Sequence, residues 1–142
     1  MKYVVLVSHG TFAQGLQSAV LMMSGKRDDV LSTSLEDGMG TNDFAFRFKE
    51  IIKPINQNDE ILLFSDILSG SPFTTSIEIL NELGLFAKTT VFAGMNMPMV
   101  LTAVLMKDSL EKPDMIEAVL SEGKMGVMLF EVDAVNFTEE EL

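Results

Sequence analysis

The one histidine of the chain, His9, follows an apolar run that covers residues 2–7. Asp66 follows a second apolar run at residues 61–65. In open parallel sheets, ligands bind beyond the carboxyl ends of the strands. If the two strands are neighbours, their axes lie about 4.8 Å apart, and the imidazole and the carboxylate can form a hydrogen bond. A carboxylate that accepts the Nδ1 proton fixes the tautomer and leaves the Nε2 lone pair free to attack.

A loop of small residues leads from Asp66 into a predicted helix. Ser71 and Pro72 suit an N-cap followed by the first helical residue. Unpaired N–H groups at a helix N-terminus bind anions, phosphate especially, and Gly70 lets the backbone approach closely. The Ser71 hydroxyl either caps the helix or binds a phosphoryl oxygen. His9 and Asp66 can also have purely structural roles, because His9 can donate a hydrogen bond to loop carbonyls and Asp66 can cap a loop. The residues alone therefore indicate a phosphate or acyl site.

Strands and helices alternate around these residues. Apolar runs predict strands at residues 2–7, 30–35, 61–65, 89–93 and 126–132. Continuous apolar strands are typical of a parallel sheet that is buried on both faces. Helices are predicted from Thr11 to Gly25, from Asn42 to Pro54, from Ser71 to Gly84, from Pro98 to Met106 and from Lys112 to Gly123. The order predicts an α/β fold with a mainly parallel sheet and right-handed crossovers.

Two further details of the helices follow from the sequence. Thr11 and Gln14 have the spacing of a capping box, and Asn42 is suited to cap the second helix. A stretch of 18 uncharged residues lies between Lys88 and Lys107. Because Pro98 and its neighbours interrupt it, we interpret it as a strand, a turn and a helix, and not as a membrane span. Its methionines are interpreted as packing residues: Met95, Met97 and Met99.

Composition excludes several classes of function. The chain has 142 residues, 47% of them hydrophobic, so it forms a real core and is not disordered. A net charge of −11 makes nucleic-acid binding an unfavourable interpretation. The chain has no cysteine, which excludes disulfides and thiolate sites and fits a reducing compartment. With a single histidine, a metal site is not expected.

Three segments, in order over residues 1–130, resemble motifs of the IIA proteins of the mannose family in the bacterial sugar phosphotransferase system. Residues 5–16, Val-Leu-Val-Ser-His-Gly-Thr-Phe-Ala-Gln-Gly-Leu, look like the start of these proteins. Residues 63–73 resemble a motif in which an aspartate precedes Gly-Gly-Ser-Pro-Phe, with Ser69 in place of the first glycine. Residues 93–99 are similar to Gly-Val-Asn-Ile-Pro-Met.

The resemblance implies a role for each site residue. His9 would accept a phosphoryl group from the carrier protein HPr and pass it to a IIB component, which serves the membrane permease IIC/IID. Asp66 would orient His9, and Ser71, beside Gly70, would lie near the phosphoryl group. No metal, nucleotide or other cofactor is implied, because phosphoryl transfer needs positioning and charge stabilisation more than covalent machinery. A cytoplasmic protein is also implied.

The resemblance further implies a sheet of order 2-1-3-4 with helices on both faces and a last, antiparallel strand that is exchanged in a homodimer. Residues 126–132 would be that strand. Residues 1–135 would form a single domain, followed by an acidic tail at 136–142.

Three alternatives remain at this stage. The IIA-like phosphotransfer subunit of dihydroxyacetone kinase would use the same histidine with a different acceptor, although the pattern Gly10, Phe12, Ala13, Gly15 favours the sugar-transport branch. A tetrapyrrole chelatase would also begin with a strand that ends in His-Gly. A serine hydrolase would use His9 and Asp66 with Ser69 or Ser71, yet the sequence has no Gly-x-Ser-x-Gly elbow after a strand.

Overall fold

The structure is a computed structural model that describes residues 1–132, and strands alternate with helices along it. The elements are β1 (Lys2–His9), α1 (Phe12–Ser24), β2 (Val30–Leu35), α2 (Thr41–Ile51), β3 (Glu60–Ser65), α3 (Ser71–Glu82), the 3₁₀ turn η1 (Phe86–Lys88), β4 (Thr89–Phe92), α4 (Met97–Met106) and α5 (Lys112–Met125). The predicted α/β class is confirmed.

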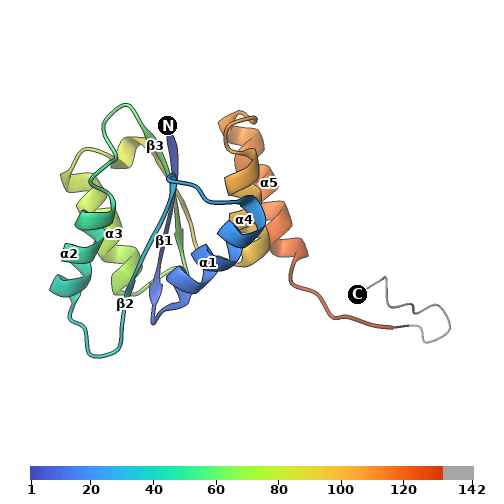
Figure 1. Ribbon diagram of the computed structural model, residues 1–142, viewed down its shortest axis with the longest axis horizontal. Helices are drawn as coiled ribbons and strands as arrows, with labels where there is room; N and C mark the ends of the chain where they lie inside the picture. Colours follow the sequence, from blue (N-terminus) through green and yellow to red (C-terminus); the bar gives the residue numbers. More distant parts are fainter. Residues whose placement is uncertain (133–142) are drawn as a thin grey trace.

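The strands form one parallel sheet in the order β2-β1-β3-β4, as the resemblance implied. The strand β1 is central and pairs with β2 on one side and β3 on the other. His9 is in register with Leu35 of β2, and Val7 is in register with Ser65 of β3. The ends of three strands therefore meet at one edge, which is the lower edge in Figure 1, where β1 passes into α1.

Helices cover both faces of the sheet. Helices α2 and α3 lie on one face, and α1, α4 and α5 lie on the other (Figure 1). Because side chains alternate along a strand, Val4 and Leu6 enter the core under α1, α4 and α5, while Val5 and Val7 enter the core under α2 and α3. The central strand is thus buried on both sides, which gives the residue at its end a rigid base.

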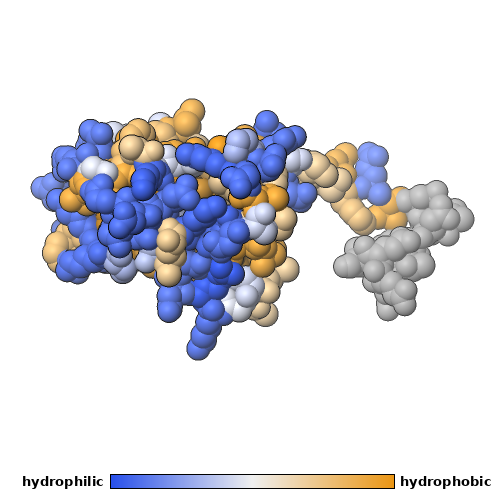
Figure 2. Space-filling model, turned by 90° about the horizontal axis from the view of Figure 1, so that it is seen from above, coloured by the Kyte–Doolittle hydropathy of each residue, from blue (hydrophilic) through white to orange (hydrophobic). Residues whose placement is uncertain are grey.

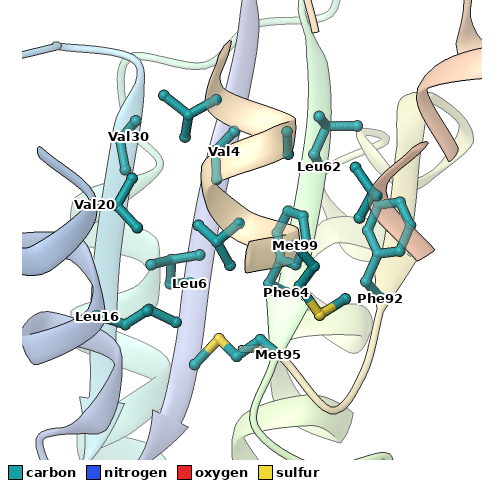
Figure 3. Close-up of a cluster of buried hydrophobic side chains, with 14 of the residues drawn as sticks. Val4, Leu6, Leu16, Val20, Val30, Leu62, Phe64, Phe92, Met95 and Met99 are labelled. Atoms are coloured by element: carbon teal, nitrogen blue, oxygen red, sulfur yellow. The ribbon is translucent and has the colours of Figure 1, made fainter. Parts of the chain in front are cut away.

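The core under α4 and α5 includes methionines of the 93–99 segment (Figure 3). Met95 and Met99 are buried, and Met97 packs against the same cluster. Phe64 stacks on Phe92 nearby, with ring centroids 4.8 Å apart. The interpretation of these methionines as packing residues is confirmed. The uncharged stretch is β4, a turn and α4, as expected, and no helix within residues 1–132 is long and apolar enough to cross a membrane.

Three predicted side-chain caps, those of Thr11, Asn42 and Ser71, are not formed. Thr11 precedes α1, but the backbone N–H of Ala13 donates to Ser8 Oγ at 2.7 Å, and Gln14 donates to Ser34 instead of closing a capping box. A hydroxyl from the preceding strand reaches the helix end, so Thr11 makes no side-chain cap bond. Gly40, and not Asn42, is the N-cap of α2.

At the start of α2, the backbone N–H of Gly40 donates to Asp43 Oδ2 at 3.1 Å. The helix therefore begins at Thr41, one residue before the predicted cap. At the start of α3, Gly70 is the N-cap, because its carbonyl accepts the N–H of Thr74 at 3.0 Å. Ser71 is the first helical residue and makes no side-chain cap bond, which corrects its predicted capping role.

Helix α5 extends past its predicted end at Gly123. A Cβ atom on Gly123 would lie 3.0 Å from Met99 Cβ, so this glycine allows α5 to pack closely on α4. The glycine predicted as a helix stop is a helix-packing residue.

Residues 126–132, predicted as a strand, form neither a helix nor a strand in the single chain. They extend from the end of α5 away from the body of the molecule (Figure 1), and Figure 2 shows hydrophobic residues along this extension. Val127, Met128 and Leu129 are each more than three-quarters exposed. Exchange of this segment in a homodimer stays a prediction, as does the domain boundary at residue 135. The acidic tail at 136–142 lies outside the described residues.

Candidate active site

His9 stands at the carboxyl end of the central strand, where the topology concentrates strand ends. Gly10, with φ +59°, turns the chain away from the sheet, and its N–H donates to the carbonyl of Leu35 at 2.9 Å. This bond extends the ladder between β1 and β2 by one residue and fixes the backbone at His9. The His9 side chain is 45% exposed, so its ring is anchored in the fold and accessible from solvent.

Asp66 lies at the end of β3 and contacts His9 through one oxygen. Its Oδ2 lies 2.9 Å from His9 Nδ1 and also accepts the backbone N–H of His9 at 3.0 Å. The backbone N–H of Asp66 donates to the carbonyl of Val7 at 3.3 Å, which continues the pairing of β3 with β1. The predicted hydrogen bond between the imidazole and the carboxylate is therefore present.

The surroundings of Asp66 keep its carboxylate charged. Partial burial raises the pKa of Asp66, but hydrogen bonds from the backbone and ring of His9 and from the backbone of Ile67 outweigh this effect and lower the pKa below its ordinary value. An ionised carboxylate accepts protons and donates none. The Nδ1 atom of neutral His9 therefore carries the proton, and Nε2 presents its lone pair.

Gly70 lies against the free edge of the imidazole. A Cβ atom at this position would lie 2.8 Å from His9 Cε1 and 3.0 Å from His9 Nε2. With φ +92°, Gly70 also has a backbone conformation that suits glycine. The absence of a side chain here lets the N-terminus of α3 approach Nε2 directly.

The first turn of α3 provides donors next to this edge. The helix begins at Ser71, and its geometry leaves the N–H groups of Ser71 and Phe73 without an acceptor inside the helix. Pro72 has no backbone N–H group, so no unpaired donor is left at its position. The positive end of the helix dipole and the Ser71 hydroxyl add to these donors, a combination that favours an anion. The structure brings His9, Asp66, Gly70 and Ser71 to one place.

Sequence reasoning missed one polar residue of this place, Thr41. Its Oγ1 donates to Ser71 Oγ at 3.5 Å from the first turn of α2. The position follows from the topology, because the loop after β2 leaves the same sheet edge as His9. A hydroxyl residue at the start of the helix that follows β2 was the available indication.

Exposed apolar side chains lie beside the polar centre. Phe12, at the start of α1, is 48% exposed, and Leu68, two residues after Asp66, is 73% exposed. Ile67 is about half exposed, and its Cδ1 would lie 3.9 Å from a Cβ atom on Gly70. Apolar groups around an open polar centre are typical of surfaces that contact other proteins.

A sequence model of a protein family described as EIIA-man, "PTS system fructose IIA component", matches residues 3–120. The chain belongs to the EIIA-Man family. Its fold and the order of its motifs agree with this membership, and the chelatase and serine hydrolase alternatives are set aside by it.

Individual relatives of this EIIA-Man protein agree with the family. The fructose-specific EIIA component of Bacillus subtilis is 22% identical over 113 residues, which cover 80% of this chain and 75% of the relative. The crystal structure of an EIIA component from Streptococcus agalactiae is 27% identical, has a TM-score of 0.76, and covers 90% of this chain and 96% of its own. The mannose/sorbose-specific IIA subunit from Enterococcus faecalis, 22% identical with a TM-score of 0.77, shares the fold over 93% of this chain and 97% of its own.

Proposed function

We propose that this EIIA-Man protein is a phosphoryl carrier in which His9 Nε2 accepts a phosphoryl group from phospho-HPr and passes it to a IIB component. The observation that carries the proposal is the contact of Asp66 Oδ2 with His9 Nδ1 at 2.9 Å. It occupies one ring nitrogen and directs the other towards Gly70 and the start of α3. Family membership supports the reaction class.

In the proposed step, the Nε2 lone pair of neutral His9 attacks the phosphorus of the donor's phosphohistidine. The new P–Nε2 bond forms while the donor's P–N bond breaks, and the donor nitrogen keeps the electron pair of that bond. The His9 ring retains its Nδ1 proton and gains a positive charge. The Asp66 carboxylate stabilises this charge, as the orienting aspartate does in hydrolase triads. Transfer to IIB reverses the step with the acceptor's nucleophile.

The start of α3 would bind the transferred group. The Ser71 hydroxyl and the N–H groups of Ser71 and Phe73 are donors for phosphoryl oxygens, and Gly70 permits their approach. Donors that are already in place stabilise charge without reorganisation at the moment of transfer. In phosphoryl transfer this positioning and charge stabilisation supply most of the catalysis.

The exposed ring of His9 and the apolar residues beside it support protein partners. A second protein's active site can reach Nε2 directly and cover Phe12, Ile67 and Leu68 as it docks. We place this exchange in the cytoplasm, with the IIC/IID permease served through IIB. A homodimer that exchanges residues 126–132 is part of the proposal.

The experiment is phosphorylation with phosphoenolpyruvate, enzyme I and HPr, followed by native mass spectrometry. We expect one phosphate on each wild-type chain and none on His9→Ala. The phosphate should be labile in acid and stable in alkali, as a phosphoramidate is. An added phosphate on His9→Ala, or an acid-stable one on the wild type, would overturn the assignment.

The acceptor distinguishes the sugar-transport branch from the dihydroxyacetone kinase branch. Isolated phosphorylated protein should lose its phosphate to a IIB protein of the mannose family and keep it when mixed with the ADP-bearing subunit of a dihydroxyacetone kinase. The fructose-specific relative from Bacillus subtilis favours the first outcome. Transfer to the kinase subunit alone would reassign the branch and retain the phosphohistidine chemistry.

A further inference from the structure

Two helix starts meet beside His9. Thr41 is the first residue of α2 and Ser71 is the first residue of α3, and the Thr41 hydroxyl donates to the Ser71 hydroxyl at 3.5 Å. Gly70, the residue before Ser71, lies against the His9 ring at Nε2. Thr41 therefore contacts the residue that follows Gly70, and Gly70 lies against the nitrogen that is proposed to carry the phosphoryl group.

The hydroxyl of Thr41 is not needed to begin its own helix. The N-terminus of α2 is closed by Asp43, whose Oδ2 accepts the N–H of Gly40 at 3.1 Å. The Thr41 side chain is exposed and points its donor towards another helix. The contact of Thr41 with Ser71 therefore has no part in starting α2.

Counting donors and acceptors gives the contact a consequence. A serine hydroxyl has one proton to donate and two lone pairs that accept. When Thr41 donates to Ser71 Oγ, one lone pair of Ser71 is occupied and its own proton stays free. That proton is available to an anion bound beside Gly70, which lies against the Nε2 edge of His9.

We propose that Thr41 is a positioning residue that directs the Ser71 hydroxyl proton onto the phosphoryl group carried by His9. The inference rests on the proposed function. Hydrogen bonds in a chain polarise one another, so donation by Thr41 strengthens donation by Ser71 to an anionic oxygen. The 3.5 Å separation is long, as catalytic hydrogen bonds commonly are before the reacting group is bound, and it shortens when Ser71 donates to phosphate.

The test uses potassium phosphoramidate, which phosphorylates histidine without a partner protein. The Nε2 lone pair attacks phosphorus, the P–N bond of the reagent breaks, and ammonia leaves after taking a proton from water. The variants are Thr41→Val, which keeps the branched shape and removes the hydroxyl, Thr41→Ala, Thr41→Ser, Ser71→Ala and the double variant Thr41→Val/Ser71→Ala. Asn42→Ala, at an exposed position beside Thr41 on α2, is the matched control.

Two quantities are measured: the rate of phosphorylation of His9, and the pKa of the phosphoryl group by ³¹P NMR. Thr41→Val and Thr41→Ala should slow phosphorylation roughly three- to tenfold, the effect of one hydrogen bond. They should also raise the pKa of the phosphoryl group, because without the Thr41 hydroxyl Ser71 donates a weaker hydrogen bond to the phosphoryl dianion. Thr41→Ser and Asn42→Ala should match the wild type. In the Ser71→Ala background, Thr41→Val should change neither quantity, because its effect acts through Ser71.

Three results would overturn the inference while leaving the proposed function in place. They are a wild-type rate and phosphoryl pKa in Thr41→Val, failure of Thr41→Ser to restore them, and an undiminished effect of Thr41→Val when Ser71 is already alanine. If the wild type takes no phosphate on His9 from phosphoramidate or from phospho-HPr, the proposed function itself fails. The reaction of the wild type therefore distinguishes failure of the inference about Thr41 from failure of the proposed function.

Discussion

One oxygen of Asp66 holds both the backbone and the ring of His9. Oδ2 accepts the His9 N–H at 3.0 Å and lies 2.9 Å from Nδ1. The backbone bond fixes the carboxylate to the central strand, and the ring bond then fixes the imidazole to the carboxylate. Asp66 therefore both positions the His9 ring and places a negative charge beside it. A substitution that keeps the hydrogen bonds and removes the charge can separate these two roles.

Asp66→Asn makes that separation. The amide oxygen can still accept from His9, so we expect a wild-type circular dichroism spectrum and a small change in unfolding temperature. Phosphoryl transfer should slow on the order of ten- to a thousandfold, because no negative charge faces the phosphorylated ring. The rate of transfer from phospho-HPr measures this. An unchanged rate would show that the carboxylate is only structural.

Gly70→Ala should damage the site more than the fold. The new Cβ would lie 2.8 Å from His9 Cε1 and would move the ring. We expect at least a tenfold slower phosphorylation of His9, together with a loss of about 1–2 kcal/mol from the positive φ. Gly25→Ala is the matched control, since φ is +85° there and the added Cβ has no neighbour within 4 Å. Equal phosphorylation rates in the two variants would contradict the close approach of Gly70 to His9.

A buried ion pair at the opposite edge of the sheet should set acid stability. Lys107, 1% exposed, donates to Asp29 Oδ2 at 2.7 Å, and Arg27 Nε donates to Asp29 Oδ1 at 2.9 Å. The hydrogen bond from Arg27, together with the hydrogen bond and the charge of Lys107, lowers the pKa of Asp29 to about 2 against the opposing effect of burial. Because the folded-state pKa is depressed, this stabilisation is present above the unfolded value, near 4, and is lost as pH falls towards 2.

The corresponding prediction concerns Asp29→Asn. At neutral pH the variant should lose on the order of 2 kcal/mol of unfolding free energy, and its stability should fall less than that of the wild type between pH 4 and pH 2. Urea unfolding across this range is the measurement. Asp108→Asn, a change to an exposed partner of Lys107, should cost less than about 1 kcal/mol. Parallel stability curves for wild type and Asp29→Asn would contradict the role of the pair.

Residues 127–132 should hold a homodimer together. Their apolar side chains are exposed in the single chain, and an extended segment of this kind is stabilised by a sheet partner. An exchanged strand buries backbone pairing and side chains, so we expect light scattering to report a dimer at micromolar concentration. Leu129→Lys should shift the population towards monomer. A wild-type monomer at that concentration would show that the exchange does not occur.

The layers and the strand ends were predictable because they depend on long-range patterns. Continuous apolar runs identify buried parallel strands, and a strand end is followed by its functional residue in the sequence. The sequence therefore predicts the contact between His9 and Asp66, on the condition that their strands are neighbours. The resemblance, and not the residues alone, supplied the sheet order.

The helix starts were less predictable because each depends on a few tenths of an ångström in a turn. Ser8 reaches Ala13 from a strand, so the capping box at Thr11 is not formed. Gly70 takes the capping position, so the Ser71 hydroxyl does not cap the helix and contacts Thr41 instead. The sequence favoured Ser71 as the cap because side-chain propensity carries no information about what else lies next to the helix. The position of Thr41 beside the site was not predicted for the same reason.

The half-open placement of His9 also determines how long a phosphorylated state lasts. The opening that admits a partner's active site admits water as well, and P–N bonds hydrolyse in water. A phosphorylated chain that meets no acceptor would discharge at a pace set by the bond itself. The fraction of chains that carry phosphate would then depend on the current rates of phosphorylation by the donor and of transfer to the acceptor. Phosphate gained earlier would be lost by hydrolysis.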